Sequence, residues 1–468
     1  MDAAVVAFVI VVYANLAALA GHRLSQPVVA GALSLGLIAL PFLMQVFVRR
    51  RSIVADTVWL GMLAFFAALL LSTFGARDPR IAFAWIVTFL TEGLLLYVLV
   101  LNAIRSARTL RRVVWALILA AAVLGSMSAY QELAHDYGRQ FGGLAQRNLE
   151  RDPGATANPS QGGVLRSRER VNVANRAAGP IGDPNRYAQM LLFVLPLAFF
   201  RMWDERRSWL RWFAAGCMLL ILVGVVLTYS RGGILTLALL VFLLLVLGHL
   251  RWRHVLIVGI LSVVLAVIVA PGLLGRLSSM GSVPALLSDR KTVQTDGAVR
   301  GRLTEMLAAL NVFLDHPVVG VGPGQFTPYY SMDYMSDPEV AFRRINRPRR
   351  AHNLYLEVAA ETGILGLVSF LAVAGLALVQ LWRVRRRWQF EAPEYAHLAT
   401  AFWLSVVAYL GTGFFLQLAY QRYYWLLLGL AGASVRALAL PPAAPAVPRA
   451  VVQSTDVRVV TREASFPS

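Results

Sequence analysis

Residues 232–249, GGILTLALLVFLLLVLGH, decide the fold class of this chain. The run contains no Asp, Glu, Lys or Arg, and a helix of its length rises about 27 Å, close to the ~30 Å of a bilayer's hydrocarbon core. Similar runs recur along the chain, which has 468 residues, 58% of them hydrophobic. Backbone polar groups in lipid must be satisfied within their own segment, so repeated apolar runs predict a bundle of membrane-spanning helices.

We predict an all-α, polytopic transmembrane domain over residues 1–440, with about twelve spans. A Pro- and Ala-rich tail at 441–468 is predicted to be disordered and cytoplasmic. The expected spans are residues 2–20, 27–48, 56–74, 81–104, 113–130, 184–200, 209–229, 232–249, 255–275, 353–382, 398–417 and 422–440.

The arginines are distributed unequally between the short loops. Arginine-rich short loops alternate with short loops that carry few arginines, and arginines in short loops stay in the cytoplasm. The expected orientation therefore places both termini in the cytoplasm. The long loops 131–183 and 276–352 then lie outside, and the second, between spans nine and ten, is expected to be partly helical. The arginine-rich short loops are residues 49–51, 105–112, 201–211, 250–254 and 383–387.

The end of the second long loop is strongly basic. The stretch FRRINRPRRAHNLYLE, residues 342–357, holds five arginines within eight residues. Two interpretations stay open: the arginines are solvated or contact anionic lipid head groups, or they form an electropositive surface for a polyanion. In the second case Arg347, Arg349 and Arg350 are candidate contacts to an anionic substrate.

Two helix starts on the predicted external side are candidate anion sites. In GDPNR, Asp183 is a good N-cap and Pro184 suits the first helical position, which puts Asn185 and Arg186 in the first turn. The free N–H groups and the positive dipole end of a helix favour phosphate there. In TYSRGG, Arg231 lies in a short external turn, before two glycines that permit close approach. For both arginines an ordinary interfacial role is the alternative.

A further helix is expected inside the second long loop, over RLTEMLAALNVFLDHP, residues 302–317. Its apolar residues 303, 306, 307, 310, 313 and 314 share one face, so the helix should lie on the membrane or pack over the bundle. Arg300 and Arg302 stand at its start, either as ligands or as parts of a structural lid helix. The glycine- and proline-rich stretch 316–326 is expected to form a tight turn.

The tenth span is expected to begin at His352–Asn353. A helix N-terminus and neighbouring arginines disfavour a protonated imidazole, so we expect His352 to be largely neutral at about pH 7, which suits a general base. An interfacial hydrogen-bonding histidine is the alternative. Asn353, Glu357 and Glu361 follow at four-residue spacing and give the helix a polar face. Glu92, in the middle of the fourth span, is interpreted as a structural partner for a buried polar group.

Several kinds of site are missing from the sequence. It has no spacing typical of metal ligands, no P-loop and no Gly-x-Ser-x-Gly elbow. We therefore predict neither a metal nor a cofactor, and no nucleic acid as a partner. Charge on a substrate must then be met by arginine, and a pyrophosphate leaving group on a lipid-linked donor fits that residue set.

These motifs resemble the O-antigen ligase/polymerase superfamily of bacterial integral membrane glycosyltransferases. The resemblance covers roughly residues 180–370 and rests on GDPNRYA, TYSRGG, the arginine-led helix running into HPVVGVGPGQF, and HNLYLEVAAETGILG. The last stretch fits the ligases' pattern of His, Asn, nine residues, Gly, two residues and Gly, at His352, Asn353, Gly363 and Gly366.

The resemblance implies an activity, partners and a location. A ligase transfers O-antigen glycan from undecaprenyl diphosphate to an outer-core sugar of lipid A–core, at the periplasmic face of the bacterial inner membrane and without a metal. On this chain it implies that Arg186 and Arg231 bind the diphosphate and that His352 activates the acceptor hydroxyl. Arginines of both long loops would guide the two lipids. The predicted substrate-binding set is Asn185, Asn353, Arg300, Arg302, Arg347, Arg349, Arg350 and Glu361.

Relatives with other activities stay open. Polymerases of the superfamily carry Arg-x10-Gly in two external loops; Arg168–Gly179 and Arg290–Gly301 have that spacing, which chance alone produces in so arginine-rich a chain. Protein O-oligosaccharyltransferases are similar too. A different class is an anion channel or transporter, with the arginines as a selectivity ring and Glu92 as the coupling group. We favour the ligase because of the histidine spacing and the large basic loop before it.

Overall fold

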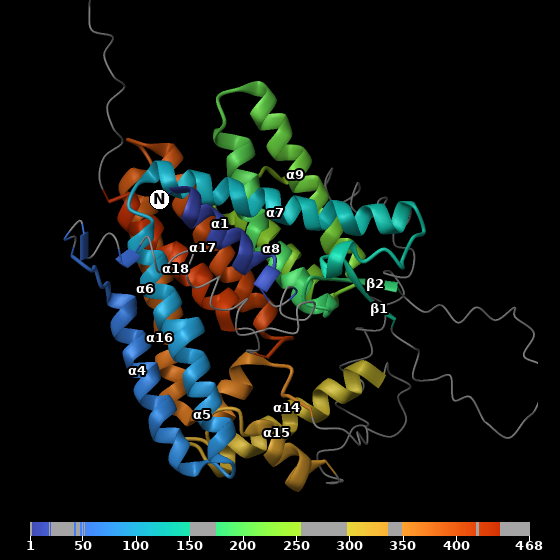
Figure 1. Ribbon diagram of the computed structural model, residues 1–468, viewed down its shortest axis with the longest axis vertical. Coiled ribbons are helices and arrows are strands. Elements are labelled where there is room, and N and C mark those ends of the chain that lie inside the picture. Colours follow the sequence, from blue (N-terminus) through green and yellow to red (C-terminus); the bar gives the residue numbers. More distant parts are fainter. Residues whose placement is uncertain are drawn as a thin grey trace, which may run out of the picture.

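The computed structural model describes residues 2–17, 19, 42–43, 47–48, 50, 52–149, 175–253, 297–335, 349–417 and 421–439. This part of the chain is mostly helical, as predicted, and it contains a two-stranded antiparallel sheet that the sequence analysis did not predict. The strands are β1 (Gln146–Leu149) and β2 (Asn175–Gly179). The helices (Figure 1) are α1 (Asp2–Tyr13), α4 (Thr57–Ser72), α5 (Pro79–Thr88), α6 (Leu96–Ala103), α7 (Ala107–Leu133), α8 (Pro184–Asp204), α9 (Ser208–Leu227), α10 (Arg231–Val246), α14 (Gly297–Asp315), α15 (Phe326–Tyr329), α16 (Leu354–Trp388), α17 (Pro393–Gly413) and α18 (Gln421–Ala437).

Helices lie at ten of the predicted apolar runs, whereas the run 255–275 and most of the run 27–48 lie outside the described residues. The run at 232–249 forms α10, which at 16 residues is one of the shorter apolar helices. The total of about twelve spans stays a prediction. Within the described residues, five helical segments are long and apolar enough to cross a membrane: Thr57–Gly75, Pro79–Ala103, Ala107–Leu133, Ser208–Leu227 and Leu354–Trp388.

Helix α8 forms the centre of the core. Every side chain from Arg186 to Phe200 is buried, and the helix packs against α7, α9, α10 and α17. A helix that is apolar all round is expected in the interior of a bundle. By contrast α4, α5, α9 and α10 expose large apolar side chains such as Leu60, Phe83 and Phe242, as expected of helices that face lipid.

The ends of α8, α16 and α17 fall into two groups. The starts of α8 and α16 meet the segment after α17, where Arg186 Nη1 and Asn353 Nδ2 donate to the carbonyls of Gln417 (3.4 Å) and Phe414 (3.2 Å). At the opposite ends of α8 and α17, His397 Nδ1 lies 2.5 Å from an Asp204 carboxylate oxygen. The helices α8 and α16 therefore run in one direction and α17 in the other, which is the alternation that the predicted topology requires.

A single arginine fixes the small sheet to the end of α7. Arg147 on β1 donates to Gln131 Oε1 at 2.8 Å and to the carbonyl of Asn175 at 2.7 Å, and it forms an ion pair with Glu132 at 3.0 Å. Its side chain is only 4% exposed. The sheet is thus held against the end of α7, and β2 ends shortly before the start of α8.

The helix expected over residues 302–317 in the second long loop is α14, and the side that packs on the bundle is not its apolar face. α14 exposes Leu310 and Leu314, at 37% and 62%, which belong to the predicted apolar face. Its buried face packs against α16 and α15 instead. Small side chains let two backbones approach closely, and this packing outweighs the burial of the larger leucines. The buried side chains are Thr304, Glu305, Ala308, Ala309 and Val312.

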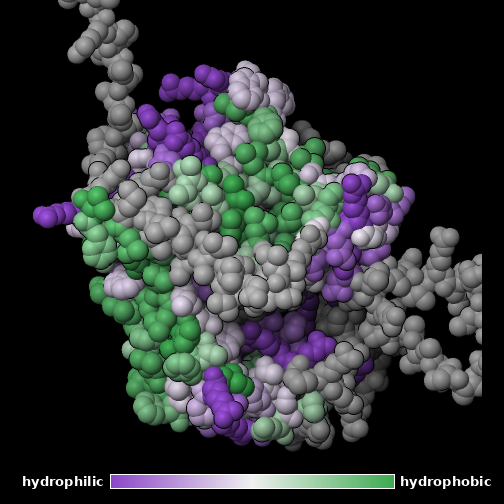
Figure 2. Space-filling view, viewed as in Figure 1, coloured by the Kyte–Doolittle hydropathy of each residue, from purple (hydrophilic) through white to green (hydrophobic). Residues whose placement is uncertain are grey.

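The surface of the molecule has one strongly polar hollow in the view of Figures 1 and 2. In Figure 1, α4, α5 and α16 lie together at the lower left and α14 and α15 lie below, while α7 crosses the upper part. Figure 2 shows apolar residues over the left and upper faces and hydrophilic residues gathered in a recess between the α14–α15 region and the helices above it.

Candidate active site

The start of α8 is built as the sequence predicts. Asp183 has extended backbone angles, and its carboxylate accepts from the amides of Asn185 at 2.8 Å and Arg186 at 3.1 Å. Pro184 occupies the first turn. Arg186 is 5% exposed, and its charge interacts with those of Arg350 and Glu357 from the start of α16.

The start of α10 is connected to the start of α8 by side chains. Arg176 of β2 donates to Asn185 Oδ1 at 3.0 Å and to the Thr228 carbonyl at 2.9 Å. Ser230, the N-cap of α10, also donates to Asn185 Oδ1, at 2.9 Å. Because Asn185 serves both helix starts, it fixes Arg231, the first residue of α10, relative to α8. The sequence analysis did not identify Arg176, whose only signal was an arginine shortly before the GDPNR cap.

Three helix starts therefore converge on the end of α17. A Cβ on Gly232 of α10 would lie 2.8 Å from the Phe415 ring, which shows how closely that helix approaches the same segment. The starts of α8 and α16 donate side-chain hydrogen bonds to it, as described above. Helix N-termini present unsatisfied N–H groups and positive dipole ends, so the convergence creates a region that favours an anion.

His352 and Asn353 begin α16 in a constrained geometry. The Asn353 side chain accepts from the amides of Tyr355 and Leu356, both at 3.0 Å, so it is the N-cap of the helix. His352 has a φ of 50°, a conformation that non-glycine residues adopt rarely. Its Nδ1 lies 3.0 Å from the Arg350 carbonyl. The ring is therefore held by its own backbone turn, with 23% of the side chain exposed.

A buried carboxylate that the sequence analysis missed lies beside this histidine. Glu305 of α14 is 1% exposed, and its Oε2 is 2.9 Å from His352 Nδ1. The contact is a close electrostatic one rather than a well-aligned hydrogen bond, because the ring N–H points to the Arg350 carbonyl. No hydrogen bond to Nε2 occurs among the described residues. Nε2 is thus the nitrogen that can receive a proton.

The negative charge of Glu305 also acts on its other neighbours. Burial raises the pKa of the Tyr330 phenol, and the carboxylate of Glu305 raises it further, so this phenol stays protonated at neutral pH. Arg349 Nε is 3.7 Å from Glu305 Oε1. Glu305 therefore contacts both the His352 imidazole and the Arg349 guanidinium.

The neighbouring arginine is fixed by a second carboxylate. Arg350 Nε is 2.6 Å from Glu357 Oε1, and its guanidinium carbon is 4.8 Å from the centre of the Trp85 ring. Glu357 is 2% exposed. Trp85 belongs to α5, so the N-terminal part of the chain, where the sequence analysis found no motif, contributes a wall of this region.

The spacing of the histidine motif follows from a break in α16. Gly363 has a φ of 63°, and a Cβ there would lie 2.2 Å from the Val318 carbonyl oxygen. The turn 317–322 pairs with this break: Val321 N donates to Ala360 O at 3.1 Å and Gly322 N to Glu361 O at 2.9 Å. Only glycine fits both the left-handed angle and the close approach.

Glu361 supports the same turn. Its side chain is 7% exposed and accepts from the amide of Phe326 at the start of α15, at 3.3 Å. Gln325 exchanges hydrogen bonds with the backbone of Asp78, at 3.0 and 2.9 Å, between α4 and α5. Arg77 Nη2 forms an ion pair with Asp333 at 2.8 Å, and the hydrogen bond to Asp333 raises the pKa of Arg77. The loop that carries α14 is thereby fixed to α5 and α16.

The structure brings together some of the predicted catalytic and substrate-binding residues. The starts of α8, α10 and α16 carry Arg186, Arg231 and His352, and the neighbouring contacts connect all three. Arg300 and Arg302 lie in the first turns of α14, which packs on α16, whereas Arg347 lies outside the described residues. Glu92 lies 3.9 Å from Arg422, at the start of α18. Within the described residues, no group of three or more His, Cys, Asp or Glu side chains could hold a metal ion.

The region that contains the histidine also carries a family signature. Residues 216–371 match the family model described as O-antigen ligase. This match supports the O-antigen ligase superfamily for the region that it covers, about a third of the chain. No curated protein matches the chain. The matched family implies a glycosyltransferase-like enzyme with glycan-lipid substrates, and the apolar helices suggest an integral membrane protein.

The match to the O-antigen ligase model spans most of the candidate active site. It runs from within α9 into α16 and includes Arg231, Glu305, the turn 317–326, His352 and Gly363. Arg186 and Arg176 precede the matched residues. Their connection to Arg231 through Asn185 is therefore an observation from the geometry alone.

Proposed function

We propose that this chain is an O-antigen ligase, which transfers a glycan from undecaprenyl diphosphate to a sugar hydroxyl of lipid A–core, without a metal. The observation that carries the proposal is the position of His352. Its Nδ1 is engaged by the Arg350 carbonyl and by Glu305, which leaves Nε2 as the base, at the place where three helix starts favour an anion.

The reaction is a displacement at the anomeric carbon of the donor. The acceptor oxygen forms a bond to that carbon as the bond to the diphosphate oxygen breaks, and the hydroxyl proton passes to His352 Nε2. The diphosphate leaves with the bonding electrons, and Arg186 and Arg231 stabilise its charge. Glu305 stabilises the imidazolium that forms, as an acid–histidine pair does in other enzymes.

The donor lipid and the acceptor lipid bind at different helices. The donor diphosphate binds at the starts of α8 and α10, where Asn185 holds both helices in register. The acceptor approaches His352 from the side of α14, over Arg349, Arg300 and Arg302. The active site lies at the periplasmic face of the bacterial inner membrane, and both termini lie in the cytoplasm, as the arginine distribution in the short loops favours.

The proposal is tested with the purified chain in lipid nanodiscs, supplied with undecaprenyl-diphosphate glycan and lipid A–core in the presence of EDTA. We expect glycan attached to lipid A–core, detected by mass spectrometry. Absence of any product under these conditions would overturn the ligase assignment.

The same assay separates the ligase from its relatives. A polymerase would lengthen the glycan on undecaprenyl diphosphate and leave lipid A–core unmodified. A protein O-oligosaccharyltransferase would require a protein acceptor. An anion transporter with Glu92 as its coupling group would yield no product; the contact of Glu92 with Arg422 supports a structural role for that carboxylate instead.

A further inference from the structure

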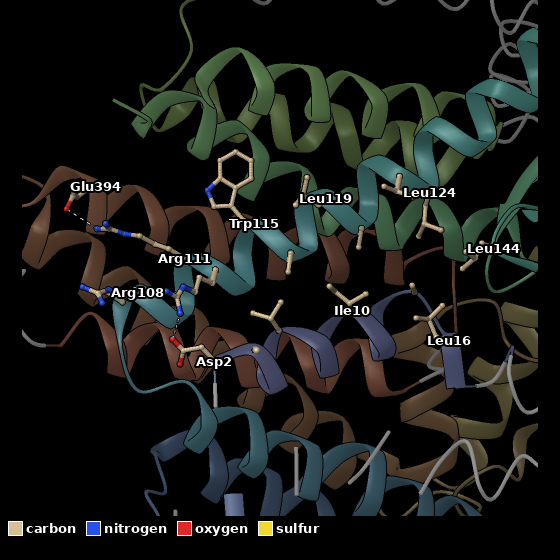
Figure 3. Close-up of a pocket in the computed structure, with 18 of the residues that line it drawn as sticks. Asp2, Ile10, Leu16, Arg108, Arg111, Trp115, Leu119, Leu124, Leu144 and Glu394 are labelled. Atoms are coloured by element: carbon tan, nitrogen blue, oxygen red, sulfur yellow. Dashed lines mark hydrogen bonds and ion pairs between the residues drawn. The ribbon is translucent and has the colours of Figure 1, made fainter. Parts of the chain in front are cut away.

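A long apolar groove runs between α1 and α7, away from the candidate active site (Figure 3). Its volume is about 1060 Å³. The lining along α7 reaches from Ala107 to Leu124, which corresponds to about 26 Å of helix. Val6 and Ile10 of α1 and Trp115 and Leu119 of α7 are among the side chains that line it. Such a lining favours hydrocarbon over water.

A polar cavity of about 420 Å³ adjoins one end of the groove. The two spaces share Arg111, Trp115 and Glu394 as lining residues, so they are adjacent. The cavity lies at the end of α8 and the start of α9. An apolar groove beside a charged cavity has the polarity of a site for one amphipathic molecule.

The charges at this end do not cancel. Six arginines and four carboxylates line the two spaces together. Each carboxylate has its own partner: Asp2 pairs with Arg112, Glu394 with Arg111, Glu205 with Arg201, and Asp204 with His397. The remaining arginines, Arg108, Arg206 and Arg207, have no acidic partner among the described residues. An anionic head group would complete the set.

A buried nitrogen gives a second indication of a missing polar group. Arg201 lines the cavity, and its side chain is 11% exposed. Its Nε is buried and has no hydrogen-bond partner in the part of the chain that the structure describes. Unsatisfied buried donors are rare, and they mark places where a ligand or ordered water binds.

The surroundings fit the interface of a membrane. Arg206 and Arg207 have three exposed tryptophans near them in the sequence. These are Trp203, Trp209 and Trp212, which are 51%, 62% and 75% exposed. Exposed tryptophans next to arginines are typical of the head-group level of a bilayer. This end of the molecule carries the short arginine-rich loops 105–112 and 201–211, so it is the end predicted to face the cytoplasm.

We propose that the α1–α7 groove and its polar cavity bind an anionic phospholipid of the cytoplasmic leaflet. An acyl chain lies along α7, and the phosphate lies among Arg108, Arg201, Arg206 and Arg207. The site is separate from the proposed active site, and its occupant is bound rather than consumed. The bound lipid would hold α1 against α7 and fix the end of α8, the central helix of the core.

Lipid retention by the full-length protein tests this proposal. The chain is delipidated in detergent, incubated with phosphatidylglycerol or with phosphatidylcholine of the same acyl composition, and examined by native mass spectrometry. We expect about tenfold more phosphatidylglycerol to be retained. The double variant Arg206→Ala/Arg207→Ala should lose that preference, whereas the matched control Arg251→Ala/Arg253→Ala, exposed arginines that line neither space, should keep it.

The apolar part of the site is tested separately. Ala120→Trp fills the groove and should reduce phosphatidylglycerol retention about tenfold, whereas Ala67→Trp on the exposed face of α4 should not. Equal retention of the two phospholipids would overturn the proposal. So would phosphatidylglycerol retention that neither Arg206→Ala/Arg207→Ala nor Ala120→Trp reduces. Binding of inorganic phosphate that Ala120→Trp leaves unchanged would indicate an ion site only and would overturn the proposal. A polyprenyl phosphate or a second copy of the chain found in the groove would identify a different occupant and overturn it too.

Discussion

At the scale of the residue, the account depends on a histidine and a carboxylate 47 positions apart in the sequence. His352 could be selected from the sequence, because the arginine distribution in the short loops placed it on the same predicted side as Arg186 and Arg231, and its role stays a prediction. Glu305 could not be selected, because the helical pattern of α14 was recognised from its apolar residues and not from its carboxylate. The carboxylate is buried by α16, an element that no local pattern connects to it.

Replacing Glu305 by Gln should slow transfer while leaving substrate affinity nearly unchanged. The amide keeps the volume but removes the charge that stabilises the imidazolium. We expect kcat to fall about 10- to 1000-fold with little change in KM, measured with both lipids varied. Asp315→Asn, an exposed carboxylate at the end of the same helix, is the control and should retain activity. An unchanged kcat in the Glu305 variant would remove this residue from the mechanism.

Gly363→Ala should destabilise the fold through the backbone. The new methyl group meets the Val318 carbonyl at 2.2 Å, and a φ of 63° is unfavourable for alanine. We expect the free energy of unfolding to fall by about 2 kcal/mol or more, measured as a lowered thermal midpoint in nanodiscs. Gly375→Ala lies in the same helix with nothing within 4 Å of the added atom. That control should be neutral or slightly stabilising, and equal effects of the two changes would contradict the role of the break.

At the scale of the element, the sequence predicted where helices begin better than what they contact. The α8 start followed from Asp183 and Pro184 alone, because capping is a local interaction. The connection of that start to α10 through Arg176 and Asn185 was not predictable, since the strand that carries Arg176 is recognisable only when paired with β1. The side of α14 that packs on α16 was not predictable from the spacing of its apolar residues, because close approach of two helices favours small side chains over large apolar ones.

The cap of α8 offers a test of the element that presents Arg186. Asp183→Ala removes the acceptor for two amides and should cost about 0.5–2 kcal/mol of stability, read from thermal unfolding. Donor affinity should fall with it, because Arg186 loses its fixed first turn. Asp183→Asn retains a capping oxygen and should preserve most of both properties. If the alanine and asparagine variants behave alike, the cap does not position the site.

At the scale of the whole molecule, the account requires that the two groups of helix ends face opposite sides of the membrane. The grouping itself follows from contacts such as those of Asp204 with His397 and of Asn353 with the end of α17. Apolar runs predicted the helical class and most helix positions. They could not predict the contact of α5 with Arg350, because that contact rests on the single side chain of Trp85.

Cysteine labelling tests the orientation directly. In a Cys217→Ser background, cysteines introduced at Asp136 and Ser208 lie at exposed positions of the two predicted sides. We expect a membrane-impermeant maleimide to modify Asp136→Cys in intact spheroplasts and Ser208→Cys only after lysis. The reverse pattern would move the candidate active site to the cytoplasm and contradict the proposed topology.

The central claim is that His352 acts as the base in glycan transfer, and one paired measurement tests it most directly. The transfer rate and the donor affinity of His352→Ala are compared with those of the unmodified chain, in nanodiscs with EDTA. The account predicts that transfer falls at least about 100-fold while binding of undecaprenyl-diphosphate glycan stays within about twofold, since the arginines of α8 and α10 hold the diphosphate. Transfer at the unmodified rate, with the glycan still joined to lipid A–core, would contradict the claim.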